Sequence, residues 1–252
     1  MSLATLIPES LSGLECLTLI LLSFFSSGLT AAMGAGGGAL LLAVMAQILP
    51  IKAVIPVHGV VQLGSAVGRV SVLWRYIHWK MVAAFLTGSL MGVAIGGQIV
   101  LSLPKALLQF ILGMFILYAA WGPKLTGFIR RNFGFGVGGM VTTFLSLFVG
   151  AMGPIVTALV KSFPLSPQGI VGTASAAIMI QHGLKVLTFG IIGFAFGDYL
   201  ALICGMIISG FLGTLVGRQF LMNVSPEKFK RGLNVILSLL AIRLLFKAIS
   251  AS

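Results

Sequence analysis

Long runs of hydrophobic residues, separated by short polar breaks, dominate the chain. A helix needs about 20 such residues to cross a bilayer. Eight runs approach or exceed that length: 11–33, 54–74, 79–102, 105–121, 134–152, 168–196, 198–220 and 231–249. The pattern predicts an all-α polytopic membrane helix bundle of about eight full spans. The run 168–196 is longer than a bilayer needs, so we expect it to tilt or break near Gly183 or Gly190.

Two further apolar runs, 38–49 and 154–163, are too short to cross as ordinary helices. Each follows a glycine-rich break and precedes a proline, Pro50 or Pro164. Runs of ten to twelve residues are typical of half-helices or re-entrant segments. We therefore predict two short broken or re-entrant helices in addition to the full spans.

Composition excludes a soluble protein. Hydrophobic residues make up 58% of the chain and charged residues 8%, against about 25% charged residues in ordinary globular domains. The 16 basic residues outnumber the four acidic ones, but they stand singly at span ends, where they set orientation and contact headgroups. We expect a lipid bilayer and no nucleic acid as partner. The first 15 residues lack the basic start of a cleavable signal, so we predict that the first apolar run is retained as a span of a multi-pass membrane protein.

The order of elements repeats along the chain. Residues 26–121 and 146–245 both show a glycine-rich break, a short run, a proline and long spans. We predict a single membrane domain with two repeat halves, 1–125 and 126–252. Basic residues cluster in the loops 75–80 and 122–131. In the second half, the counterpart of 75–80 is 197–199, which has no basic residue, whereas the counterpart of the sparse turn 102–105 is 222–231, which has three. This exchange predicts an inverted repeat.

The glycine-rich breaks are candidate anion sites. The first contains Gly34, Gly36, Gly37 and Gly38, and the second contains Gly150 and Gly153. A helix start presents free N–H groups and a partial positive charge, so two starts that face each other near the midplane can hold an anion. The alternative is close helix packing through small residues. Packing needs spaced glycines, which are found instead at Gly88, Gly92, Gly96, Gly210, Gly213 and Gly217.

Ionisable residues within the spans extend the candidate site. A cation at membrane depth costs at least about 2.5 kcal/mol and usually has a function. Arg69 and Lys185 lie in such positions, although Arg69 is near enough to a span end to snorkel. His58 and His182 each precede a glycine and have a nearby glutamine, Gln62 or Gln181. A histidine here is either an anion donor, a proton-coupling group or a packing residue. The predicted substrate-binding set is Gly34, Gly36, Gly37, Gly38, His58, Gln62, Arg69, Gly150, Gly153, His182 and Lys185.

Missing residue types exclude other functions. The four acids, Glu9, Glu15, Asp198 and Glu227, all lie near segment ends, so no buried carboxylate is expected for a cation site or a proton relay. Hydrolase and P-loop motifs do not occur, and metal ligands are too few. We predict no enzymatic activity, no catalytic residue, no metal and no cofactor.

Three stretches resemble the sulfite exporter TauE/SafE family of membrane permeases. They are GAGGGALLLAVMAQILPIKAVIP, GSLMGVAIGGQIVLSLPKALLQFILGMFIL and the second-half series VGAMGPIVTALVKSF, GIVGTASA and SGFLGTLVGRQFLMNVSPEKFKRGLNVIL. The resemblance covers nearly the whole chain and implies transport of sulfur-containing anions such as sulfite, sulfoacetate or other organosulfonates. The second break departs from the first in its Gly-Pro pair, Gly153 and Pro154.

Together these observations predict a secondary transporter for a small sulfur-containing anion, working by alternating access at a midplane site. Three alternatives stay open at this point. They are an anion channel, an intramembrane enzyme that uses the histidines, and a non-transporting membrane subunit. The expected partner is a small anionic substrate, and the sequence leaves open whether the chain forms a homo-oligomer.

Overall fold

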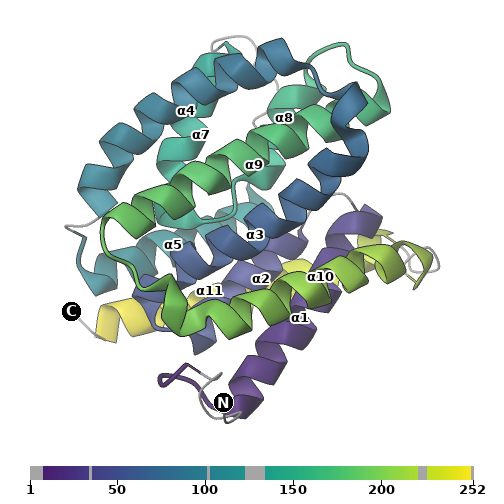
Figure 1. Cartoon of the computed structure of the whole chain (residues 1–252). Helices are drawn as coiled ribbons and strands as arrows, with labels where there is room; N and C mark the ends of the chain where they lie inside the picture. Colours follow the sequence, from purple (N-terminus) through teal and green to yellow (C-terminus); the bar gives the residue numbers. More distant parts are fainter. Residues whose placement is uncertain (1–7, 34–35, 101–102, 123–133, 221–225, 251–252) are drawn as a thin grey trace. The chain divides into compact units, whose positions relative to one another are not determined.

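The computed structural model describes residues 8–33, 36–100, 103–122, 134–220 and 226–250, and all regular structure in these ranges is helical (Figure 1). The α-helices are α1 (Gly13–Met33), α2 (Gly37–Ile48), α3 (Ile51–Leu73), α4 (Trp79–Val100), α5 (Lys105–Trp121), α7 (Phe135–Val149), α8 (Gly153–Lys161), α9 (Pro167–Ile191), α10 (Leu200–Phe220) and α11 (Pro226–Ser250). Two 3₁₀ turns, η2 (Trp74–Tyr76) and η3 (Phe196–Tyr199), precede α4 and α10. The all-α prediction is confirmed.

Helix length separates the spans into two groups. Within the described ranges, six helices are long and apolar enough to cross a membrane: α1, α3, α4, α9, α10 and α11. The predicted full spans at α5 and α7 have 17 and 15 residues, which places them with α2 among the shorter apolar helices. The short runs form α2, with 12 residues, and α8, with nine. The chain is therefore a multi-pass membrane protein, and the count of eight full spans stays a prediction.

Helix α9 differs from expectation at one point. It runs unbroken through Gly183 and ends at Ile191, one residue after Gly190. The chain then turns at Gly193, whose φ of +88° lies in the left-handed region that glycine reaches without strain. Of the two positions predicted for a break, the helix therefore ends near Gly190 and not at Gly183, because the apolar residues after Gly190 form this turn and η3 instead of extending the helix.

The described helices divide between two compact units. Unit 1 comprises Met1–Val61, Leu103–Gly122 and Ala195–Ser252; unit 2 comprises Gln62–Ser102 and Pro123–Phe194. Unit 1 thus contains α1, α2, the first half of α3, α5, α10 and α11. Unit 2 contains the second half of α3, α4, α7, α8 and α9. Each unit combines elements of both predicted repeat halves, 1–125 and 126–252, and the inverted relation between those halves stays a prediction.

In unit 2, α4 and α7 pack through glycine. A Cβ at Gly88 or Gly92 of α4 would overlap backbone atoms of Gly136 or Met140 on α7. The approach is also hydrogen bonded, since the Thr143 hydroxyl donates to the Ser89 hydroxyl over 2.8 Å. The packing role that the glycine spacing predicted for α4 is confirmed.

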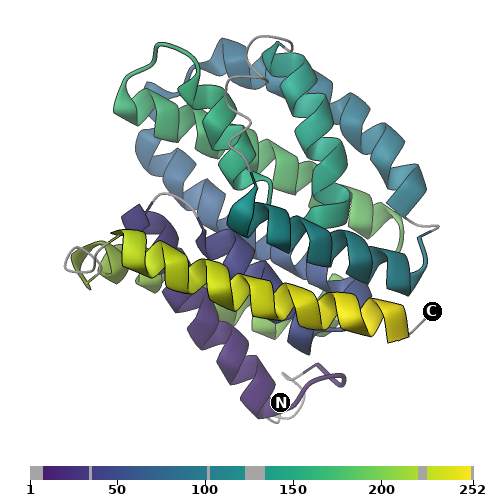
Figure 2. The ribbon, with the colours of Figure 1, turned by 180° about the vertical axis from the view of Figure 1, so that it is seen from behind.

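In unit 1, α1 and α10 pack by the same means. A Cβ at Gly213 of α10 would overlap the carbonyl of Phe24 on α1. The Ser23 hydroxyl donates to the carbonyl of Met206 over 2.7 Å, and the Ser209 hydroxyl donates to that of Ile20 over 2.7 Å. Figure 2 shows α11, in yellow, alongside α5, in teal, and these two helices also pack together.

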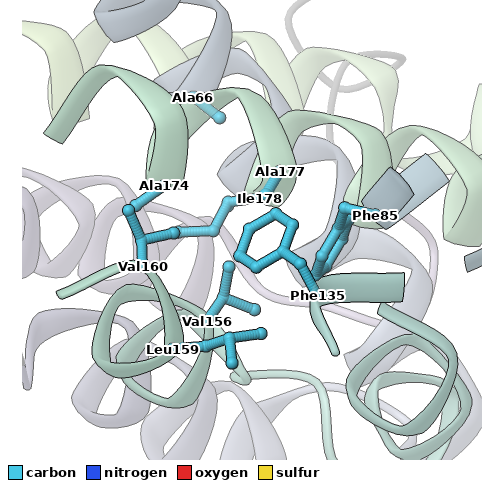
Figure 3. Close-up of a cluster of buried hydrophobic side chains, with 9 residues drawn as sticks. All are labelled: Ala66, Phe85, Phe135, Val156, Leu159, Val160, Ala174, Ala177 and Ile178. Atoms are coloured by element: carbon cyan, nitrogen blue, oxygen red, sulfur yellow. The ribbon is translucent and has the colours of Figure 1, made fainter. Parts of the chain in front are cut away.

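A cluster of buried hydrophobic side chains fixes the short helix α8 in unit 2 (Figure 3). Val156, Leu159 and Val160 of α8 are fully buried in it. Figure 3 shows them beside Ile178 of α9, with the ring of Phe135 from α7 in the same cluster. Close packing of this kind leaves α8 little freedom to shift along α9, so the segment that joins α7 to α8 is held against α9.

Candidate functional site

The break between α7 and α8 turns on one glycine. Helix α7 ends at Val149, and Gly150 has a φ of +77°, a conformation that costs other residues roughly 1–2 kcal/mol. The Gly150 N–H donates to the Ser146 carbonyl over 3.1 Å and closes α7. After two further buried residues, α8 begins at Gly153 with Pro154 in its first turn. The turn leaves the Gly150 carbonyl oxygen available to a side chain from α9.

That side chain is Lys185. It lies on α9, is 0% exposed, and donates from Nζ to the Gly150 carbonyl over 2.9 Å. Nζ also lies 3.4 Å from Nδ1 of His182, which is 1% exposed. When Lys185 is an ammonium it has only donors, so Nδ1 accepts and the imidazole is neutral. The close contact between the two nitrogens therefore allows at most one positive charge on the Lys185–His182 pair.

One face of α9 lies along the break between α7 and α8. Ile178, Gln181, His182 and Lys185 are spaced three and four residues apart and share this face. Ile178 Cδ1 lies 3.6 Å from where a Cβ on Gly153 would be. Since Lys185 reaches Gly150, the face extends over the whole break, and Gln181 and His182 lie between its two ends.

Gln181 is the unusual residue of this face. Its side chain is 0% exposed, and neither Nε2 nor Oε1 has a hydrogen-bond partner among the described residues. Buried polar groups in native proteins almost always have a partner, and each exception calls for an explanation such as a bound ligand or water. The amide therefore marks a place where a polar ligand can be bound.

The charge at this site is not balanced by the protein. Among the residues whose side chains the structure describes, Lys185 is the only buried lysine or arginine. Its hydrogen-bond partners among the described residues are a carbonyl and an imidazole. Of the acids whose side chains are described, Glu9 and Asp198 are exposed, and the half-buried Glu15 is hydrogen bonded to Ser12. An unpaired ammonium away from water is costly. A bound anion would supply the missing charge.

The break between α1 and α2 lies in unit 1. Gly36 has a φ of +101° and precedes α2 as its cap. Gly38 accepts at its carbonyl oxygen from Nε2 of the fully buried His58, at 3.1 Å. Each break thus has a left-handed glycine, and each places a backbone carbonyl near a side chain of the following long helix. Gly34 lies outside the described residues.

Gly37 corrects one expectation. We expected consecutive glycines to indicate a binding site and spaced glycines to indicate packing. A Cβ at Gly37, however, would overlap the Ser26 carbonyl and the Thr30 hydroxyl of α1. Gly37 is therefore needed for close approach of α2 to α1, because a helix that starts against another helix also requires a small residue at its first turn.

Arg69 does not join the Lys185 cluster. In unit 2 its Nε donates to the Ser175 hydroxyl over 3.1 Å, and its Nη1 donates to the Ser65 hydroxyl over 2.7 Å. Ser175 and Lys185 are ten residues apart on α9, or about 15 Å along the helix axis. A small anion bound at Lys185 cannot reach Arg69 at the same time.

A comparison with protein families matches residues 19–244 to the family described as Sulfite exporter TauE/SafE. The chain belongs to the sulfite exporter TauE/SafE family. The resemblance inferred from the sequence motifs is confirmed. Comparisons with curated proteins and with solved structures gave no match.

Membership in the TauE/SafE family fixes the general role of the chain. The family consists of membrane exporters of sulfite or related anions, and the six long apolar helices agree with an integral multi-pass membrane protein. A family of transporters is also consistent with a chain that is not an enzyme. The glycine-rich breaks and the polar face of α9 all lie within the matched residues.

The structure groups the predicted site residues of this TauE/SafE chain within each unit. Unit 2 brings Gly150, Gly153, His182 and Lys185 together, and unit 1 brings Gly36, Gly37, Gly38 and His58 together. Gln62 is half-buried on α3, and its role stays a prediction. The meeting of the two breaks also stays a prediction. The predicted set omitted Gln181, although its position four residues before Lys185 could have placed it on the same face.

Proposed function

We propose that the chain is a secondary carrier that moves a small sulfur-containing anion, sulfite or an organosulfonate, across the cell inner membrane by alternating access. The observation that carries this proposal is the fully buried Lys185, which has no carboxylate partner among the side chains that the structure describes. A permanently unpaired charge inside a membrane protein is retained where it has a function. In a family of anion exporters, that function is to bind the anion.

The surrounding groups suit sulfonate oxygens. Such oxygens accept hydrogen bonds, and the site offers donors from the Lys185 ammonium and the Gln181 amide. The start of α8 adds backbone N–H groups and a partial positive charge. Pro154 removes one of those N–H groups. Side chains therefore supply a larger share of the donors to the anion here than at a break made of glycines alone.

The membrane potential supports export. An inside-negative potential favours outward movement of each negative charge by about 2.3 kcal/mol per 100 mV. A carrier of this kind therefore needs no coupling ion to move its substrate out of the cell. Alternating access would expose the site to each side in turn.

Flux measurements on purified protein test the proposal. Proteoliposomes that contain the chain are loaded with radiolabelled sulfite, and efflux is followed in wild type, Lys185→Met and Lys161→Met. Lys161 is an exposed lysine at the end of α8 and serves as the matched control. We expect the initial efflux rate of the Lys185→Met variant to be lower than that of wild type by about tenfold or more. The reason is that a hydrogen bond to a charged group is worth about 1.5–3 kcal/mol.

The same assay separates the alternatives. Saturation of the rate with sulfite concentration supports a carrier, whereas a linear rate indicates a channel. Liposomes without any flux indicate a subunit that does not transport alone. Equal efflux from wild type and Lys185→Met, with Lys161→Met also unchanged, would show that the buried ammonium is not part of the transport site.

A further inference from the structure

We infer that the site around Lys185 binds its anion in a singly charged form, and so selects monoanionic sulfonates over dianions of similar shape. This inference rests on the proposed function and specifies its substrate class. Its basis is the number of positive charges in unit 2 that can reach one small anion.

First, the number of buried positive charges limits the charge of the anion that the site can bind. Lys185 is the only lysine or arginine that is buried among the described side chains, and the other described ones are exposed or half-buried. Arg69, the nearest candidate for a second charge on this helix pair, is held by Ser65 and Ser175 about 15 Å along α9. One full positive charge is therefore available.

The second step concerns His182. Its Nδ1 lies 3.4 Å from the Lys185 ammonium and faces it as an acceptor. A protonated imidazole would place a second N–H donor and a like charge against that ammonium, which disfavours protonation. His182 therefore adds no second charge beside Lys185.

The third step concerns the neutral groups. The Gly150 carbonyl already accepts from Lys185, and the Gln181 amide carries no net charge. The start of α8 contributes at most about half of a positive charge, and Pro154 removes one of its N–H groups. The second charge of a dianion would thus remain largely uncompensated in a buried site, which is strongly disfavoured.

Matched anion pairs test this inference on the wild-type protein. Thermal stabilisation in detergent is measured at constant ionic strength with methanesulfonate and with sulfate, which are both tetrahedral but carry one and two charges. A second pair, 2-hydroxyethanesulfonate and sulfoacetate, differs by a terminal carboxylate. In each pair we expect the monoanion to reach half-maximal stabilisation at a concentration lower by about tenfold or more, a difference of about 1.4 kcal/mol.

Two variants assign the selectivity to Lys185. Lys185→Met should lose monoanion stabilisation, whereas Lys185→Arg, which retains the charge, should keep the preference for monoanions. Lys161→Met should behave as wild type. If the Met variant does not fold, the wild-type panel and the Arg variant still decide the question.

The possible failures are distinguishable. Dianions that bind as tightly as their monoanionic partners, while anion efflux from proteoliposomes is intact, overturn the single-charge inference and leave the carrier proposal standing. Absence of both binding and efflux for every anion overturns the proposed function itself.

Discussion

At the scale of single residues, two left-handed glycines determine where the short helices begin. Gly36 and Gly150 have φ values of +101° and +77°. The Gly150 carbonyl accepts from Lys185, and the carbonyl of Gly38, two residues after Gly36, contacts His58. A side chain at such a position strains the backbone and rotates its peptide groups. Both stability and the position of the carbonyl therefore depend on glycine.

Replacing Gly150 with alanine should lower stability and transport together. The positive φ costs an alanine about 1–2 kcal/mol, which corresponds to roughly 2–4 °C per kcal/mol in a chain of this size. Any relief of that strain moves the carbonyl that Lys185 contacts, so sulfite efflux should also fall. Thermal unfolding in detergent and efflux from proteoliposomes measure the two effects.

Gly134 provides the control at the other end of α7. It is the N-terminal cap of that helix, with a φ of −63° and open space where a Cβ would lie. Gly134→Ala should cost less than about 1 kcal/mol, from the weaker preference for alanine at a helix N-cap, and should leave sulfite efflux unchanged. Equal effects of the two substitutions would mean that the left-handed turn at Gly150 is not required.

His58 is expected to contribute to stability through Gly38. His58→Leu removes the 3.1 Å contact and leaves the half-buried Gly38 carbonyl oxygen without that partner, at a cost of about 0.5–1.5 kcal/mol. The exposed His78 offers the comparison His78→Leu. Thermal unfolding should show a lower melting temperature for the first variant alone, and an unchanged value would show that the contact contributes nothing.

At the scale of elements, the contact between α4 and α7 depends on the absence of side chains. Gly92→Ala would place a Cβ against the Met140 carbonyl, and such overpacking costs about 1–3 kcal/mol. Gly68 of α3 has nothing within 4 Å of its Cβ position, so Gly68→Ala should instead stabilise the protein, by up to about 1 kcal/mol. Opposite signs in thermal unfolding would confirm this account, whereas destabilisation by both would contradict it.

Sequence patterns predicted most element boundaries because apolar runs end at prolines and charges. Lys105 begins α5 and Pro167 begins α9, as the pattern indicated. The sequence named Gly183 and Gly190 as possible breaks of the long run and could not choose between them, because a glycine in a membrane helix does not by itself stop hydrogen bonding along the helix; α9 ends beside Gly190. The packing role of Gly37 and the unpaired amide of Gln181 depend on contacts with other elements, which no local pattern contains.

At the scale of the whole molecule, the compact units do not follow the order of the chain. Helix α10 of the second half packs on α1 of the first, and α4 of the first half packs on α7 of the second. In each case the partner helix presents a backbone surface that only a glycine-bearing helix can approach. Neither predicted half therefore contains a complete packing partner for its first helix, α1 or α7.

Because the packing partners come from different halves of the sequence, the arrangement predicts how the chain behaves when it is divided. Residues 1–125 and 126–252, expressed as two separate polypeptides, should assemble with each other and restore sulfite efflux. Each half alone lacks the partner of α1 or of α7, so its glycine-lined face remains without a matching helix and it should aggregate in detergent. Affinity purification through a tag on one half, followed by efflux measurement, tests both statements.

A full-length chain with a protease site between residues 125 and 126 is the matched control. Cleaved after folding, it should keep both fragments together and retain efflux, because the contacts between α1 and α10 and between α4 and α7 are non-covalent. A single half that purifies as a monodisperse protein with cooperative thermal unfolding would contradict the requirement for packing partners from both halves. In that case the packing of each compact unit would be completed within one half, and the repeat would be an independent folding unit.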